Sequence, residues 1–152
     1  MSRHSLILAG LVLAATPGWA FAQSAQTYEA ELDPTPFDAT TRAIVIGAIG
    51  QVSATLDGNR LTVTGRFSDL TSPATAAGLR TGLAKGVPGD AIGTLTVTHD
   101  TSGSISGSVT LGAAQLEALN RQSIYVRVDS QKAPDGNLQG WLEPANGGEG
   151  DN

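Results

Sequence analysis

The sequence contains no cysteine, few aromatic residues and few charged ones. Without cysteine, none of its 152 residues can form a disulfide, a thiolate metal ligand or a thiol nucleophile. Only 9 lysines and arginines stand against 14 aspartates and glutamates, giving a formal net charge of −5. The chain therefore lacks the basic surface that binds nucleic acid or anionic lipid, and we expect no nucleic-acid partner.

Residues 1–22 show the pattern of a secretory signal peptide. Arg3 and His4 precede an apolar run, and Ala20-Phe21-Ala22 forms a small-x-small cleavage site. The apolar run has about ten residues, whereas a membrane-spanning helix needs about twenty. We expect cleavage after Ala22, a periplasmic or secreted location and no membrane insertion after cleavage. The remaining chain divides into a domain over residues 23–144 and a flexible, acidic, glycine-rich tail over residues 145–152.

The domain alternates apolar and polar residues with the period of two that is typical of half-buried strands. About seven strands are expected, separated by turn signals roughly every ten residues. Their ranges are 27–32, 44–56, 61–67, 92–98, 104–111, 123–129 and 138–142. Ala113 to Leu119 is the one expected helix, before the penultimate strand, with Leu116 and Leu119 covering one end of the core. This pattern predicts an all-β fold, a Greek-key sandwich or barrel.

Two stretches interrupt the strand pattern. In the thirteen-residue strand expected at 44–56, Gly47 or Gly50 should produce a bulge or bend. Residues 68–91 contain four glycines and two prolines without sustained periodicity, so they are expected to form one long connection. Long connections of this kind are either functional or mobile, and the sequence leaves both readings open.

Six stretches, taken together and in this order, resemble the CHRD domain, named from the growth-factor antagonist chordin. They lie within residues 50–57, 61–70, 72–77, 115–119, 124–126 and 134–142. The resemblance covers about Thr27 to Leu142 and identifies the chain as a member of this family in an exported, bacterial form. It implies an immunoglobulin-like β-sandwich or barrel, distantly similar to copper-zinc superoxide dismutases, with no settled activity.

The chain departs from the family at polar positions. Family members often carry His-x-His at positions that correspond to Gly78 and Arg80, and a histidine near Asp129. They also tend to have Glu and Arg where this chain has Asn137 and Gln139. We expect the three former histidine positions to be neighbours and an Arg80–Asp129 ion pair to have replaced them. The alternative is that Arg80 lies in water and Asp129 pairs with Arg127 or Lys132, or with nothing.

Other residues with possible chemistry each have a plainer interpretation. His99, the only histidine beyond the signal, is expected to be a surface turn residue, and the alternative is a weak metal ligand. Glu29, Glu31, Asp33 and Asp38 could be calcium ligands, but their spacing matches no calcium loop and favours a solvated strand face. Tyr125 and Trp141 are either exposed platforms for sugar or protein, or packed residues.

These observations favour a soluble, exported binding or interaction module that is not an enzyme. We expect no catalytic residue, no cofactor and no metal site. The partner is expected to be a protein or an envelope component, bound through residues 68–91 and the neighbouring strand ends. The candidate binding residues are Arg80, Tyr125, Arg127 and Asp129. Two alternatives stay open: a metal or redox protein related to copper-zinc superoxide dismutase, and a structural component of an envelope or extracellular assembly. The sequence leaves the oligomeric state undetermined.

Overall fold

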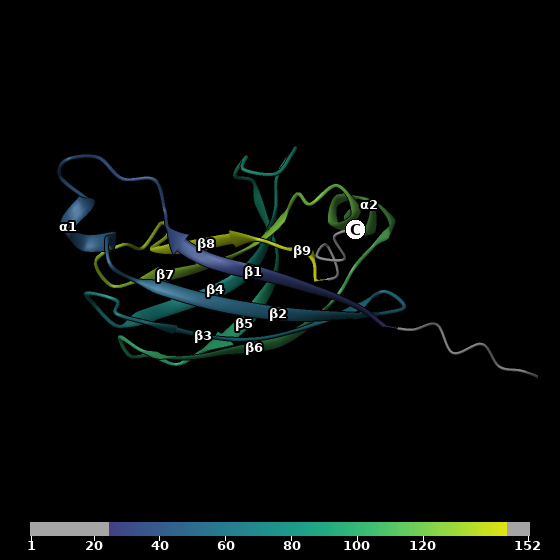
Figure 1. Cartoon of the computed structure of the whole chain (residues 1–152), viewed down its shortest axis with the longest axis horizontal. Coiled ribbons are helices and arrows are strands. Elements are labelled where there is room, and N and C mark those ends of the chain that lie inside the picture. The colour runs from purple at the N-terminus through teal and green to yellow at the C-terminus, as the bar shows by residue number, and fades with distance from the viewer. Residues whose placement is uncertain (1–24, 146–152) are drawn as a thin grey trace, which may run out of the picture.

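Nine antiparallel strands and two short helices make up residues 25–145, the part of the chain that the computed structural model describes (Figure 1). The strands are β1 (Gln26–Pro34), β2 (Ile49–Asp57), β3 (Arg60–Ser68), β4 (Ala74–Thr81), β5 (Asp90–Val97), β6 (Gly103–Thr110), β7 (Ile124–Ser130), β8 (Leu138–Trp141) and β9 (Glu143–Pro144). The helices are α1 (Arg42–Val45) and α2 (Ala113–Asn120). The all-β prediction is confirmed, with a few more strands than expected.

The strands form a closed barrel. Their order is β2-β3-β6-β5-β4-β7-β8-β1-β9, and β1 also pairs with β2, which closes the ring. The ring has two layers, one that contains β2, β3 and β6 and one that contains β4, β7 and β8. β1 and β5 each belong to both layers: in β1, residues 26–32 pair with β2, whereas Asp33 and Pro34 pair with β8. The sequential strands β4, β5 and β6 lead back to β3, which is a Greek-key arrangement.

The core lies inside this ring and follows the predicted alternation. In β3, Leu61, Val63 and Phe67 are buried, while Thr62 and Thr64 between them are exposed. In β7 the inward residues are again every second one, from Ile124 to Ser130. Leu119 of α2 is buried and Leu116 packs against the same core, so the helix covers one end of the barrel as predicted. No helix within the described residues is long and apolar enough to cross a membrane.

The strand expected over residues 44–56 begins five residues later than predicted. Its first part is the single turn of α1, which ends before Gly47. Gly47 has φ +90, a conformation that side chains other than glycine rarely adopt, and it redirects the chain into β2. As a result Val45 and Ala48 are buried, whereas Ile46 is exposed.

The prediction of one long connection over residues 68–91 is wrong, because β4 and the start of β5 lie within it. β4 is a central strand that pairs with β5 on one side and β7 on the other. The sequence conceals it for two reasons. Alanine and glycine occupy half of the strand, and irregular pairing between Ala74 and Ala76 shifts the alternation of buried residues. Two shorter connections remain in this range: residues 69–73 before β4, and residues 82–89 between β4 and β5.

The predicted signal peptide, residues 1–22, lies outside the described residues, as do residues 146–152 of the predicted tail.

Candidate functional site

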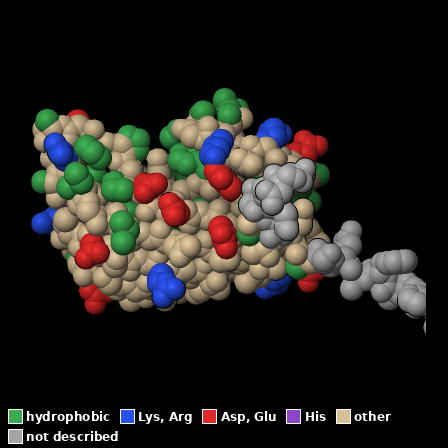
Figure 2. All heavy atoms as spheres, in the orientation of Figure 1, with side chains coloured by type: hydrophobic (Ala, Val, Ile, Leu, Met, Phe, Trp, Pro, Cys, Tyr) green, Lys and Arg blue, Asp and Glu red, His purple; other side chains and the backbone are tan. Residues whose placement is uncertain are grey.

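Two segments project from the same side of the barrel, above β8 and β7 (Figure 1). The first is the α1 segment, residues 35–48, and the second is the β4–β5 loop, residues 82–89. Together with Ile49 at the base of the α1 segment, they carry every large hydrophobic side chain that is exposed in the described chain: Phe37, Ile46, Ile49, Leu83 and Val87. Leu83 is the extreme case, at 89% exposed. Figure 2 shows hydrophobic side chains gathered on two projections with a notch between them and acidic side chains below it.

A turn built on Asp38 shapes the α1 segment. One carboxylate oxygen, Oδ1, accepts hydrogen bonds from the backbone N–H groups of Thr40 and Thr41 at 2.8 and 2.9 Å. The hydroxyls of both threonines donate to the same oxygen. These donors favour the ionised form, and they lower the pKa of Asp38 to about 2, with the Thr40 hydroxyl the largest contributor. The carboxylate of Asp38 therefore stabilises this turn, and it does not line the same depression as Glu29, Glu31 and Asp33.

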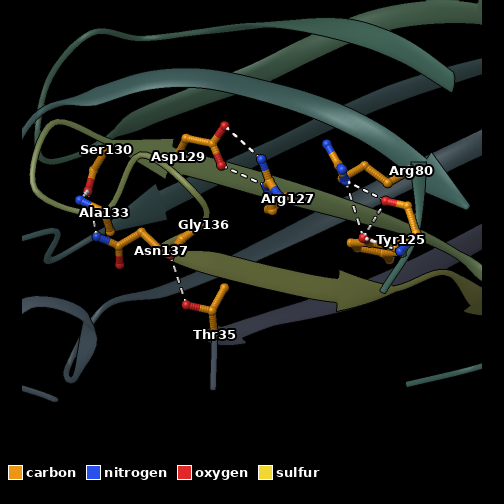
Figure 3. Close-up of polar contacts among 10 residues, drawn as sticks. Thr35, Arg80, Tyr125, Arg127, Asp129, Ser130, Ala133, Gly136 and Asn137 are labelled. Atoms are coloured by element: carbon orange, nitrogen blue, oxygen red, sulfur yellow. Dashed lines mark hydrogen bonds and ion pairs between the residues drawn. The ribbon is translucent and has the colours of Figure 1, made fainter. Parts of the chain in front are cut away.

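The hydroxyl of Tyr125 holds the β4–β5 loop on the barrel (Figure 3). It accepts a hydrogen bond from the Gly89 N–H at 3.0 Å and from Arg80 Nε at 3.2 Å. It also lies 3.2 Å from the Gly89 carbonyl oxygen, to which it can donate, and Arg80 Nε donates to that oxygen at 3.0 Å. Arg80 and Tyr125 are opposite each other on β4 and β7, so the sheet register places them for this contact.

Tyr125 and Trp141 stack on each other on the outer face of β7 and β8. Their ring centroids are 4.8 Å apart with an angle of 27° between the planes. The pair results from the register, because the two residues are direct cross-strand partners. Tyr125 is 1% exposed and Trp141 is partly buried, so Tyr125 is a packed residue and only Trp141 keeps exposed surface.

Asp129 forms its ion pair with Arg127 and not with Arg80 (Figure 3). Arg127 Nε and Nη2 donate to the two carboxylate oxygens of Asp129 at 2.7 and 3.3 Å. The predicted Arg80–Asp129 pair is wrong because Asp129 lies opposite Ala76, four residues before Arg80 along β4, a separation of about 13 Å. Gly78, Arg80 and Asp129 do lie on the outer face of these neighbouring strands.

A cleft of about 360 Å³ separates the α1 segment from the outer face of β7 and β8. Tyr125, Arg127 and Gln139 line its strand side, and Pro36 and Ile44 line its α1 side. Pro88 brings the β4–β5 loop to its edge. Of the four residues predicted to bind, Tyr125 and Arg127 line this cleft, whereas Arg80 and Asp129 support it from neighbouring positions.

A second depression, which we call the acidic groove, runs along β1 beside β8 and β9 and has a volume of about 650 Å³. Its charged lining residues are Glu29, Glu31, Asp33, Glu143 and Lys85. Gln139 lines both the groove and the cleft, so the two adjoin at this residue on the outer face. Lys85, from the β4–β5 loop, forms an ion pair with Glu143 at one wall of the groove.

The remaining predictions on polar residues have clear outcomes. The side chains of Glu29, Glu31 and Asp33 are exposed on the outward side of β1, as predicted for a solvated strand face. His99 is exposed in the turn after β5. Within residues 25–145, no three His, Cys, Asp or Glu side chains come together closely enough to hold a metal ion.

Three residues of this face are not among the site residues predicted from the sequence. Gln139 is identified there only as a departure from the family, and Lys85 and Glu143 belong to no motif. The alternation of β8 could have indicated that Gln139 and Trp141 share its outward face, since they are two positions apart in the strand. Their partners, Arg127 and Tyr125, depend on the pairing of β7 with β8, which the sequence alone does not show.

Comparison with known proteins agrees with this architecture and with the resemblance drawn from the sequence. A search of curated proteins and a search of solved structures found no match. The family model described as the CHRD domain matches residues 28–142, which is most of the chain and includes every strand from β2 to β8. The chain belongs to the CHRD domain family.

Proposed function

We propose that this protein is an exported, non-catalytic binding module whose partner is a protein or an envelope component. The observation that carries the proposal is the confinement of all five large exposed hydrophobic residues of the described chain to one side of the barrel. Scattered single apolar residues are normal on a protein surface, but exposed apolar residues gathered on two projections of one side are typical of an interaction site. Membership of the CHRD domain family is consistent with such a module.

The construction of the cleft also supports binding. Tyr125, Arg80 and Gly89 hold the β4–β5 loop at its base, and the Asp38 turn fixes the local conformation of the α1 segment. Both projections are thus ordered, which reduces the conformational entropy lost when a partner binds. Arg127 presents its charge at the cleft while it is paired with Asp129, so it is fixed in direction.

Affinity capture with matched variants tests the proposal. The purified chain should retain a partner from envelope extracts, and Leu83→Ser combined with Val87→Ser should abolish the capture because it removes the apolar surface of the loop. Ala84→Ser is the control, since Ala84 is exposed in the same loop and contributes little apolar area. Equal capture by the double variant and the wild type would show that this surface is not the binding site.

Export is tested separately from binding. Removal of the predicted signal leaves a protein that begins at Gln23, so sequencing of the native N-terminus should return Gln23-Ser-Ala. Cell fractionation should place the protein in the periplasm or the medium. A native protein that retains Met1 and stays in the cytoplasm would contradict the exported part of the proposal.

A further inference from the structure

The acidic groove carries an excess of negative charge. Four carboxylates line it, those of Glu29, Glu31, Asp33 and Glu143, against the single ammonium of Lys85. All four side chains are exposed, and within the described chain only Glu143 has an ion-pair partner. Arg66 of β3 does not line the groove, but it lines the adjoining depressions together with Glu29, Glu31 and Asp33. Like charges at this density repel one another, and a positively charged ligand would relieve that repulsion.

The spacing of these carboxylates matches an extended chain. Glu29, Glu31 and Asp33 occupy alternate positions of β1, so their side chains leave the same face at intervals of about 6.6 to 6.8 Å. Every second side chain of an extended peptide repeats at the same interval. A segment with basic residues at alternate positions could therefore meet all three carboxylates in one register.

Trp141 adds an aromatic surface to the wall of the groove. Tyr125 is stacked against it at 4.8 Å, and the indole keeps partial exposure on the groove side. A cation within about 6 Å of an indole centroid is attracted to it, and the stem of a lysine or arginine packs on the same surface. The chain's own Lys85 already reaches this wall to pair with Glu143, with both side chains about half exposed.

We infer that the acidic groove binds an extended segment of a partner protein that carries lysine or arginine at alternate positions. The inference rests on the proposed binding function and names the class of partner. The partner is another molecule, because no two of the nine lysines and arginines of this chain are two positions apart. A second copy therefore has no such segment to offer.

Trp141 makes the inference measurable by fluorescence. The sequence contains two tryptophans, and Trp19 lies in the predicted signal, so a chain that begins at Gln23 has Trp141 as its only tryptophan. That chain keeps the entire buried core, which lies between Tyr28 and Leu142. The probe is a blocked peptide of about seven alternating lysines and valines, long enough to place three lysines against the three carboxylates of β1.

We expect the lysine–valine peptide to change Trp141 emission saturably, with an affinity that falls as salt rises, because exposed charges are screened. Glu31→Gln combined with Asp33→Asn should weaken binding about tenfold, since each exposed ion contact adds a modest amount. Glu117→Gln is the control for a surface carboxylate outside the groove: Glu117 is exposed on α2 and does not line the groove, so the affinity should not change. Circular dichroism and thermal melting of each variant confirm that it is folded.

Several results would overturn the inference. The lysine–valine peptide could cause no change in Trp141 emission at millimolar concentration. A peptide with glutamate in place of lysine could bind with equal affinity, or the Glu117→Gln control could lose affinity equally. A glycan array could show that a neutral glycan occupies the groove, or sedimentation could show that a second copy of the chain does. If any of these occurs while Leu83→Ser with Val87→Ser still abolishes capture, the groove inference fails and the proposed binding function stands.

Discussion

Tyr125 points away from the barrel core, yet it is almost completely buried, because Trp141 covers its ring and the β4–β5 loop covers its hydroxyl. A single oxygen atom thus joins three elements: β7, which carries it, β4 through Arg80, and the loop through Gly89. Asp38 has a comparable role in the α1 segment, where one carboxylate oxygen accepts from four donors. At this scale the candidate site is held by polar atoms rather than by hydrophobic packing.

Tyr125→Phe should loosen the β4–β5 loop while preserving the aromatic stack. The variant leaves the Gly89 N–H without its partner, and we expect a loss of about 1 to 2 kcal/mol in the free energy of unfolding. Hydrogen exchange should become faster in residues 82–89, as measured by NMR or mass spectrometry. Tyr28→Phe is the matched control, because the Tyr28 hydroxyl bonds only to the Gln26 side chain. Equal loosening of the loop in both variants would contradict this assignment.

The Asp38 turn should persist to unusually low pH. The pKa of Asp38 in the folded chain, about 2, lies below the usual carboxyl value of 3.8, so folding favours the ionised form. The contribution of the turn is complete above pH 3.8 and is lost as the pH falls through about 2. An NMR titration of the Asp38 carboxyl measures this directly. Asp38→Ala should speed exchange of the Thr40 and Thr41 amides, and Asp38→Asn, which keeps an acceptor oxygen, should restore part of the protection.

At the scale of elements, the hairpin of β2 and β3 sets the register of one layer. The two strands pair without interruption from Ile49 with Ser68 to Asp57 with Arg60, and Gly58 takes a positive φ in the tight turn. Because side chains alternate across a strand, a slip of one residue would exchange the buried and exposed faces. The alternation in the sequence was therefore sufficient to predict which residues of β3 are buried.

Val63→Asp should unfold the protein, and Thr64→Asp should be tolerated. Val63 is 0% exposed, and a buried carboxylate without a partner costs several kcal/mol, whereas Thr64 is exposed on the opposite face. Thermal melting followed by circular dichroism distinguishes the two variants. A cooperative melt of Val63→Asp near the wild-type temperature would mean that the register of β3 is wrong.

At the scale of the whole molecule, a chain without cysteine has to be held by its core and its closed ladder. The ring of eight strands leaves few free edges, and α2 covers one end. The two projecting segments stand outside this ring, so their exposed residues can vary without disturbing the core, whereas Val45 and Ala48 of the α1 segment are buried. This separation of scaffold and surface is common in modules that bind partners through loops.

The folded domain should be equally stable in reductant and in chelator. The sequence has no disulfide to reduce, and the described residues offer no cluster of metal ligands for a chelator to empty. We expect the melting temperature to change by less than about 5 °C in either reagent, which corresponds to about 1 kcal/mol for a domain of this size. A larger drop in chelator alone would reveal a stabilising metal and would argue against the interpretation of the acidic residues as a solvated face.

The sequence by itself determined the class of fold, the strands with strict alternation and the family. Patterns of period two are local, so β3, β6 and β7 and the helix before β7 could be predicted from neighbouring residues alone. β4 was missed because its small residues and irregular pairing leave no local pattern. α1 was missed because one turn of helix before Gly47 resembles the start of a strand.

Only the tertiary structure decided which residues meet on the outer face. The prediction that Arg80 pairs with Asp129 was chemically reasonable, but the partners of each depend on register: Tyr125 lies opposite Arg80, and Arg127 lies next but one to Asp129. The cleft and the acidic groove combine β1 with β7, β8 and the loop after β4, segments that are far apart in the sequence. Which of these segments become neighbours is set by long-range strand pairing, and a single sequence carries almost no local trace of it.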